Sequence, residues 1–242
     1  MSLVSTEAFV INGFRYGETS KIVTFYSIEF GKFSAIVKGV RSFKSHHSGV
    51  FENMNLVNLH FNKKENRSLQ VITKAECINS FKNIKNNLDK LNLAYQVIEI
   101  VNKTSIEYDT HKDIYFLLKD VFLLIEMMKN ENELPLLLFA VKLAKLLGVE
   151  PIIMQKGVNN ERAMFVSDGT FTIDKTLMLS DDEYNLLNLL RNYNFELNEN
   201  INCNVYIVEK FLKLYESFFM QGFQKSVYLK TKKIKEELKR KI

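Results

Sequence analysis

A run of cations without acidic neighbours is the part of this sequence best suited to specific chemistry. The segment 32–44 reads KFSAIVKGVRSFK and contains four cations, Lys32, Lys38, Arg41 and Lys44. Gly39 permits a tight turn within the segment, and Phe43 places an aromatic ring among the charges. Cations neutralise phosphates and aromatic rings stack on bases, so the segment predicts a nucleic-acid contact. The competing interpretation is a solvated basic loop.

Positive charge is concentrated at both ends of the chain. Residues 1–104 carry a net charge of +6, residues 105–200 carry −7 and residues 201–242 carry +6, within a total of +5. This distribution favours a polyanionic partner if the two ends meet in space, although a moderate net charge also serves solubility. The remaining candidate nucleic-acid-binding cations are Arg15, Lys21, Lys230, Lys232, Lys233, Lys239 and Arg240.

No set of residues supports catalysis. Residues 13–21 resemble a phosphate-binding loop only superficially, because Glu18 stands where that loop needs Lys before a hydroxyl residue. The acidic residues 181–183 follow Ser180 and predict a helix N-terminus rather than a metal site. The four histidines lack metal-ligand spacing. We therefore expect no enzyme, no metal and no cofactor.

The two cysteines and the apolar runs indicate the compartment. Cys77 and Cys203 lie far apart and match no disulfide framework, which favours a reducing cytoplasm. The apolar runs are too short for a membrane span, and the first residues lack the pattern of a secretion signal. We expect a cytoplasmic protein without membrane contact.

Residues 1–78 predict a small β-barrel that binds nucleic acid. Five runs rich in Val, Ile, Phe and Thr are separated by turn residues, at 3–12, 21–28, 32–38, 51–61 and 68–74. Five short strands without a long intervening helix match the strand count of an OB-fold. In the third run, Phe33, Ala35 and Val37 alternate with polar or exposed positions and are expected to face the core.

The apolar period then changes to that of helices. Helices are expected around 91–101, 114–128 and 136–147, and again after Ser180 and over 208–219. Gly148 is expected to end the third helix, with Pro151 after it, and Asp168-Gly169 predicts a β-hairpin insertion at about 149–179. The expected fold class is therefore α+β, with an N-terminal five-stranded OB-fold barrel followed by an all-helical domain at 79–242 that carries the hairpin.

Several short motifs, in their order, resemble the bacterial RecO recombination-mediator family along essentially the whole chain. The similar segments are YGETSKIVTF at 16–25, FGK at 30–32, VKGVR at 37–41, Ser45, AE at 75–76, GVEP at 148–151 and SVYL at 226–229. Many members of that family hold a four-cysteine zinc site after the Glu-Pro turn, and this chain has no cysteine there. The hairpin insertion is therefore expected to be a degenerate, zinc-ribbon-like segment that folds without metal.

The resemblance implies a function that the residues alone leave open. It implies a recombination mediator in recombinational DNA repair that binds single- and double-stranded DNA and anneals complementary strands. It also implies contact with the C-terminal tail of the single-stranded-DNA-binding protein SSB, partnership with RecR in loading RecA, and association with the bacterial nucleoid. From the residues alone, an RNA-binding OB-fold protein of ribosome assembly or translation and a scaffold for acidic proteins remain alternatives. A nuclease would need a cluster of carboxylates that the sequence lacks.

Overall fold

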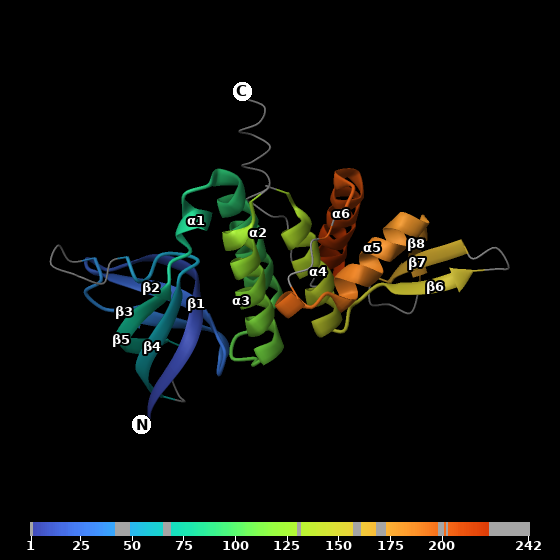
Figure 1. Cartoon of the computed structure of the whole chain (residues 1–242). Coiled ribbons are helices and arrows are strands. Elements are labelled where there is room, and N and C mark those ends of the chain that lie inside the picture. Colours follow the sequence, from blue (N-terminus) through green and yellow to red (C-terminus); the bar gives the residue numbers. More distant parts are fainter. Residues whose placement is uncertain are drawn as a thin grey trace. The chain divides into compact units, whose positions relative to one another are not determined.

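The computed structural model describes residues 2–41, 49–64, 69–129, 132–156, 161–167, 173–197, 201 and 203–222. The chain forms two compact units, Met1–Phe122 and Leu123–Ile242. Each unit has its own labelled strands and helices (Figure 1). Among the described residues, no helix is long and apolar enough to cross a lipid bilayer.

The first unit begins with a closed five-stranded barrel, which confirms the predicted OB-fold. Its strands are β1 (Ser2–Tyr16), β2 (Ser20–Ser27), β3 (Gly31–Val37), β4 (Leu56–Lys63) and β5 (Gln70–Asn79). They pair in the order β1-β2-β3-β5-β4, and β4 returns to β1. All neighbours are antiparallel except β3 and β5, which run parallel over a two-residue register. An OB-fold has this number of strands in a Greek-key barrel.

Alternating apolar residues fill the barrel. Phe33, Ala35 and Val37 of β3 are buried while the residues between them are partly exposed, as the sequence pattern predicts. The Phe33 ring lies 5.5 Å from the ring of Phe25 and 5.4 Å from that of Phe61, centroid to centroid. These aromatic contacts add directional attraction to the area buried in the core.

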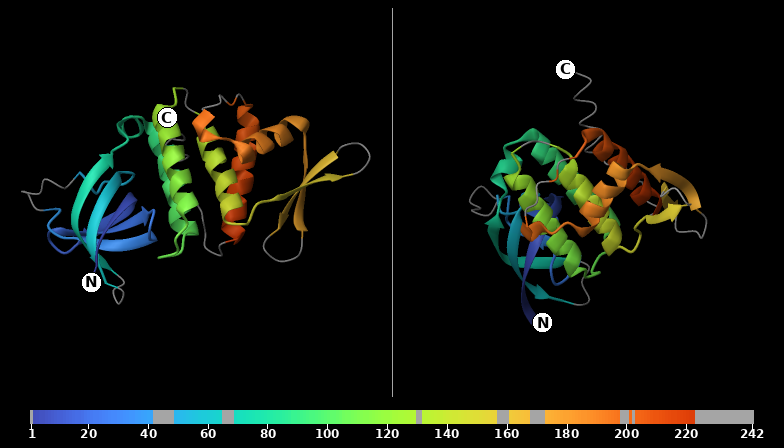
Figure 2. Two further views of the ribbon diagram at one scale, coloured as in Figure 1. Left: turned by 60° about the horizontal axis from the view of Figure 1, so that its bottom comes forward. Right: turned by 45° about the vertical axis from the view of Figure 1, so that its right-hand side comes forward.

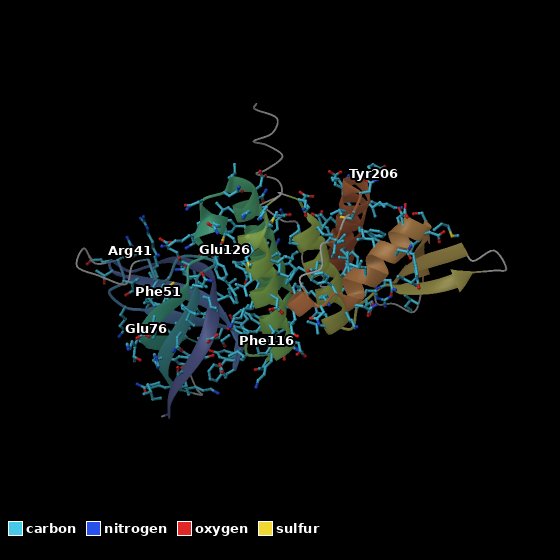
Figure 3. The ribbon with its side chains drawn as sticks, in the orientation of Figure 1. Arg41, Phe51, Glu76, Phe116, Glu126 and Tyr206 are labelled. Atoms are coloured by element: carbon cyan, nitrogen blue, oxygen red, sulfur yellow. The ribbon has the colours of Figure 1, made fainter. Side chains whose placement is uncertain are left out.

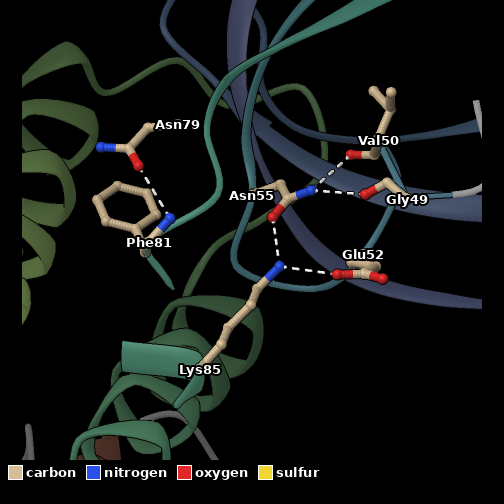
Figure 4. Close-up of polar contacts among 7 residues, drawn as sticks. All are labelled: Gly49, Val50, Glu52, Asn55, Asn79, Phe81 and Lys85. Carbon is tan, nitrogen blue, oxygen red and sulfur yellow. Dashed lines mark hydrogen bonds and ion pairs between the residues drawn. The ribbon is translucent and has the colours of Figure 1, made fainter. Parts of the chain in front are cut away.

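The predicted limits of three strands are wrong: β5 continues to Asn79 rather than ending at residue 74, and β4 and β1 differ for local reasons. The fourth strand begins at Leu56 rather than Phe51, because Met54 adopts a φ of 75° and Asn55 closes a turn ahead of the strand. The Asn55 amide donates to the carbonyls of Gly49 and Val50 at 2.8 and 3.0 Å (Figure 4). The first strand continues to Tyr16 because a bulge near residue 11 lets β1 pair with β4 and then with β2.

The helices in the described part of the first unit are α1 (Lys82–Lys85), α2 (Leu88–Thr104) and the part of α3 (Lys112–Met127) up to Phe122. The sequence did not predict α1. The Asn87 side chain caps α2 by accepting hydrogen bonds from the backbone N–H groups of Asp89 and Lys90. Phe9, on the outer face of β1, packs on Phe81 and Phe122 and buries that face of the barrel under the helices.

The turn between β2 and β3 is tied to the loop between α2 and α3. The backbone N–H of Tyr108 donates to the carbonyl of Lys32 at 2.8 Å, and the Thr110 hydroxyl donates to the carbonyl of Glu29 at 3.3 Å. Gly31 has a φ of +60°, and a Cβ atom at that position would lie 1.9 Å from the carbonyl oxygen of Asp109. The close approach of two backbone segments here requires glycine.

Helices and a small sheet make up the described part of the second unit (Figure 2). Its elements are α4 (Leu134–Leu146), β6 (Ile152–Lys156), β7 (Glu161–Ser167), β8 (Ile173–Leu179), α5 (Asp181–Asn192), the short 3-10 helix η1 (Phe195–Leu197) and α6 (Val205–Gly222). The strands form one antiparallel sheet in the order β6-β7-β8. The sequence predicted a hairpin, which corresponds to β7 and β8, but it did not predict β6. The Asp168-Gly169 turn lies outside the described residues.

The predicted ends of two helices are confirmed. Gly148 follows α4 with a φ of +68°, and its N–H donates to the Lys145 carbonyl at 3.1 Å. The N–H of Val149 reaches the Ala144 carbonyl at 2.9 Å, which completes a Schellman motif. At the start of α5, Ser180 and Glu183 form the predicted capping box, with both reciprocal hydrogen bonds present.

Candidate nucleic-acid interface

The turn between β1 and β2 brings predicted cations together at one end of the barrel. Arg15 of β1 and Lys21 of β2 are register partners on either side of the turn, so their side chains leave the same face of the sheet. Gly17 adopts a φ of +59° within the turn, and no atom would contact a Cβ there. The turn also contains Glu18, an exposed acidic residue.

The end of β3 adds two more cations. Val37, the last residue of β3, is the register partner of Lys21, and Lys38 follows it in an exposed position. Arg41 then folds back on the β1–β2 turn. Its backbone N–H donates to the Thr19 carbonyl at 2.8 Å, and its guanidinium donates to the Gly17 carbonyl at 3.2 Å.

These residues form a cluster that is partly held in place before any ligand arrives. We refer to Arg15, Lys21, Lys38 and Arg41 as the turn-end cluster. Figure 3 labels Arg41, which lies at one end of the barrel. A guanidinium has five N–H donors, so the hydrogen bond of Arg41 to Gly17 engages only part of its donor capacity. These four cations outnumber the one carboxylate of the β1–β2 turn, that of Glu18.

Two exposed aromatic residues in the same strand end were missed by the sequence analysis. Phe14 is 56% exposed and Tyr16 is 51% exposed, on either side of Arg15 in β1. Their register partners are Ile22 and Ser20 of β2. Both rings therefore lie on the opposite face from Arg15, where they can stack on unpaired bases. The sequence does contain a signal for these exposed rings: Phe14 and Tyr16 are two positions apart and stand directly before the turn glycine, Gly17.

Lys32 lies away from the turn-end cluster. It stands near the beginning of β3, whereas Lys38 and Arg41 follow the end of that strand. Its ammonium donates to the carbonyl of Asn102 in the last turn of α2 at 2.7 Å. Because cations near a helix C-terminus interact favourably with the exposed carbonyls, this contact gives Lys32 a role in joining the barrel to α2. A role of Lys32 in nucleic-acid binding stays a prediction.

The other predicted residues fall outside the described parts of the chain. They are Phe43, Lys44, Lys230, Lys232, Lys233, Lys239 and Arg240. Their participation likewise stays a prediction. Within the described ranges, no group of three or more His, Cys, Asp or Glu residues could hold a metal ion.

The second unit has a cleft of about 620 Å³ beside α5 and the beginning of α6. Its walls include Leu186, Leu189 and Ile207. Among the lining residues that the structure describes, the charged one is Asp182. An acidic partner tail would be attracted by a cation at the rim of an apolar pocket, and this lining has an anion instead.

Comparison with known proteins identifies related sequences over most of the chain. Two family models match it: "Recombination protein O N terminal" over residues 1–81 and "Recombination protein O C terminal" over residues 85–227. The first of these regions contains the barrel and the turn-end cluster. The second contains helices α2 to α6 and the small sheet.

Individual relatives share about a quarter to a third of their residues with this chain. The "DNA repair protein RecO" of Syntrophus aciditrophicus is 33% identical over 148 residues, which cover 61% of this chain and 57% of the relative. The protein of the same name from Prosthecochloris aestuarii is 30% identical over 161 residues, which cover 66% of this chain and 60% of the relative. The protein of that name from Chlorobium limicola is 26% identical over 179 residues, which cover 74% of this chain and 66% of the relative. The matched part of this chain thus spans about three-fifths of the length of these relatives.

Proposed function

The chain belongs to the RecO family of recombination proteins, and we propose that it is a recombination mediator in DNA repair that binds DNA through the turn-end cluster. The observation that carries the proposal is the gathering of Arg15, Lys21, Lys38 and Arg41 around one turn of a closed OB-type barrel. In OB-folds, the loop between strands 1 and 2 and the face of strands 2 and 3 are where oligonucleotides bind.

The chemistry of the site fits binding and strand annealing rather than bond cleavage. Two complementary strands repel each other through their phosphates, and a cationic surface lowers this repulsion by releasing condensed counterions. The exposed rings of Phe14 and Tyr16 offer stacking surfaces to unpaired bases without selecting a sequence. Neither step requires a nucleotide, a metal ion or a nucleophile, so we propose that the protein is not an enzyme.

Further partners belong to the same proposal. We propose that the protein contacts the C-terminal tail of SSB, works with RecR, and so helps to load RecA onto SSB-coated single strands in the bacterial cytoplasm and nucleoid. Family membership supports these partners. The cleft beside α5 is not assigned to the SSB tail, because the charged residue in its described lining is Asp182.

The test removes two cations of the turn-end cluster and measures the salt dependence of DNA binding. Lys38→Ala combined with Arg41→Ala should weaken binding to every DNA sequence alike. The slope of log affinity against log salt should become shallower by about 1.4 on single strands and about 1.8 on duplexes, since each lost phosphate contact contributes about 0.7 or 0.9. The readout is fluorescence anisotropy of labelled oligonucleotides at several salt concentrations.

A matched control separates this site from net charge. Lys112→Ala combined with Lys213→Ala removes the same charge from exposed helix positions of α3 and α6. The control should keep the slope of the unchanged protein. Equal slopes for all three proteins would refute the assignment. Preferential binding of RNA over DNA of the same sequence would favour the RNA-binding alternative.

Annealing is measured separately with two complementary labelled oligonucleotides, without nucleotide or metal. The unchanged protein should accelerate pairing of both bare and SSB-coated strands, and the Lys38→Ala, Arg41→Ala protein should do so less. Failure of the unchanged, folded protein to accelerate either reaction would refute the mediator role.

A further inference from the structure

A cleft of about 360 Å³ adjoins the turn-end cluster within the first unit. It is bounded by the barrel on one side, through Gly13 and Lys21, and by α2 on the other, through Leu91 and Tyr95. The segment before β4, including Glu52, also lines it. A volume of this size falls within the range that binds small organic groups.

We propose that this barrel–helix cleft holds one unpaired base of a bound single strand; the proposal rests on the DNA-binding function proposed above. Lys21 belongs both to the turn-end cluster and to the lining of the cleft. A phosphate bound between Arg15 and Lys21 would therefore lie at the cleft entrance. The adjacent base of an unstacked strand then reaches the interior, whereas a base held in a duplex stays in its stack.

The walls of the cleft suit a base. Leu91 and Tyr95 are four residues apart in α2 and so share one face of that helix. Tyr95 is 36% exposed, which leaves part of its ring open to contact. Aromatic rings beside a cationic groove are the feature with which proteins capture single-stranded bases. Gly13, opposite, carries no side chain that would narrow the space.

The polar part of the lining favours a base over an acidic peptide. Lys85 is already engaged, because its ammonium donates to Asn55 at 2.6 Å and to the Glu52 carboxylate at 2.9 Å (Figure 4). The Glu52 side chain is 59% exposed and lines the cleft. The exposed Glu52 carboxylate can accept hydrogen bonds from an exocyclic amino group, such as that of cytosine, and a peptide carboxylate has no such donor. The cleft is therefore expected to prefer cytosine to thymine.

The experiment compares Tyr95→Ala with the unchanged protein on three ligands: a deoxycytidine 20-mer, an abasic 20-mer of the same backbone, and a 20-base-pair duplex. Tyr95→Ala should weaken binding to the deoxycytidine strand by roughly tenfold, the order of loss expected for one stacking contact. It should leave abasic and duplex affinities unchanged, because neither ligand places a base in the cleft. Unchanged duplex affinity also shows that the variant is folded.

Two more variants sharpen the result. Gly13→Leu should give the same pattern by filling the cleft, since a Cβ at Gly13 meets neighbours only at ordinary contact distances of 3.5 and 3.6 Å. Phe116→Ala removes a half-exposed aromatic residue of α3 that does not line the cleft, and should change none of the affinities.

The outcomes distinguish this inference from the function on which it rests. Equal loss on all three ligands, or no loss on the deoxycytidine strand, would overturn the base-binding cleft while leaving the DNA-binding function intact. The same conclusion follows if an acidic peptide binds in the cleft beside Tyr95 and nucleic-acid bases do not. That result would assign the cleft to a protein partner. Absence of DNA binding by the unchanged protein would overturn the proposed function itself.

Discussion

Replacing Gly31 by alanine tests the join between the barrel and the helices. Gly31 and Gly17 have nearly the same backbone conformation, with φ values of +60° and +59°. At Gly17 a Cβ would meet no atom within 4 Å, whereas at Gly31 it would lie 1.9 Å from the Asp109 carbonyl oxygen and 2.8 Å from the carbonyl carbon. Gly17→Ala therefore measures backbone strain alone, and Gly31→Ala measures the same strain plus the steric conflict.

The magnitudes follow from these two contributions. Left-handed backbone costs an alanine about 1 kcal/mol, which is the expected loss for Gly17→Ala. At Gly31 the α2–α3 loop must also withdraw, and it takes with it the hydrogen bonds from Tyr108 and Thr110 to the β2–β3 turn. Each such bond contributes about 1 kcal/mol, so Gly31→Ala should lose about 3 kcal/mol.

Hydrogen exchange is the suitable assay, because the chain has two units and a single unfolding midpoint would mix them. Amides in the middle of β2 and β3 should exchange roughly a hundredfold faster in Gly31→Ala and roughly fivefold faster in Gly17→Ala, if they exchange through opening of this unit. Amides of α5 in the second unit should be unaffected and serve as the internal reference. Equal acceleration in both variants would refute the steric reasoning.

Three further substitutions test other parts of the structure. Asn55→Ala should destabilise the first unit by about 2–3 kcal/mol, read from hydrogen exchange of its strand amides, because it removes the side-chain hydrogen bonds to two loop carbonyls and to the Lys85 ammonium; a loss below 1 kcal/mol would contradict this. Tyr115→Phe should cost about 1 kcal/mol by removing the 2.7 Å hydrogen bond to Glu7, and unchanged exchange of β1 amides would count against it. Burial acts to raise the pKa of Glu183, but hydrogen bonds from Lys210 and Ser180 outweigh it and hold that pKa below its ordinary value. The ionised carboxylate therefore stabilises the second unit at pH values above the ordinary Glu pKa, and this stabilisation is lost as the pH falls through the lowered pKa of Glu183. Glu183→Gln should cost about 1 kcal/mol of stability at pH 7 and nothing in acid. A cost that does not depend on pH would refute the assignment.

Local signals in the sequence predicted much of the fold. The alternation in 32–38, the capping box at Ser180 and the glycine at 148 each depend on neighbours a few residues away, and all three are confirmed. The start of β4 could not be predicted in the same way. It depends on a side-chain amide, Asn55, that closes a turn ahead of an otherwise strand-like run. The length of β1 depends on pairing with two different partner strands.

The candidate site was likewise predictable in part from the sequence and in part only from the fold. The sequence singled out Lys38 and Arg41, and the structure brings them next to Arg15 and Lys21 through strand register. Lys32 belongs to the same basic run, but β3 separates it from the others by its own length. Lys32 lies six positions before Lys38 along an extended strand, so its ammonium reaches α2 instead of the turn-end cluster, and charge patterning along a sequence cannot reveal this separation.

The double pairing of β1 has a consequence for how the protein is made. Residues of β1 pair with residues of β4 that lie about fifty positions later, as in Ala8 with Val57, and the parallel seam between β3 and β5 needs Gln70 and Val71. On a ribosome the barrel therefore cannot close until β5 has left the exit tunnel. At about 5–20 residues per second, the edge of β1 waits several seconds for its partner. During that interval Val4, Ala8 and Phe9 remain open to other chains, so slow translation of this segment should favour aggregation of the nascent protein.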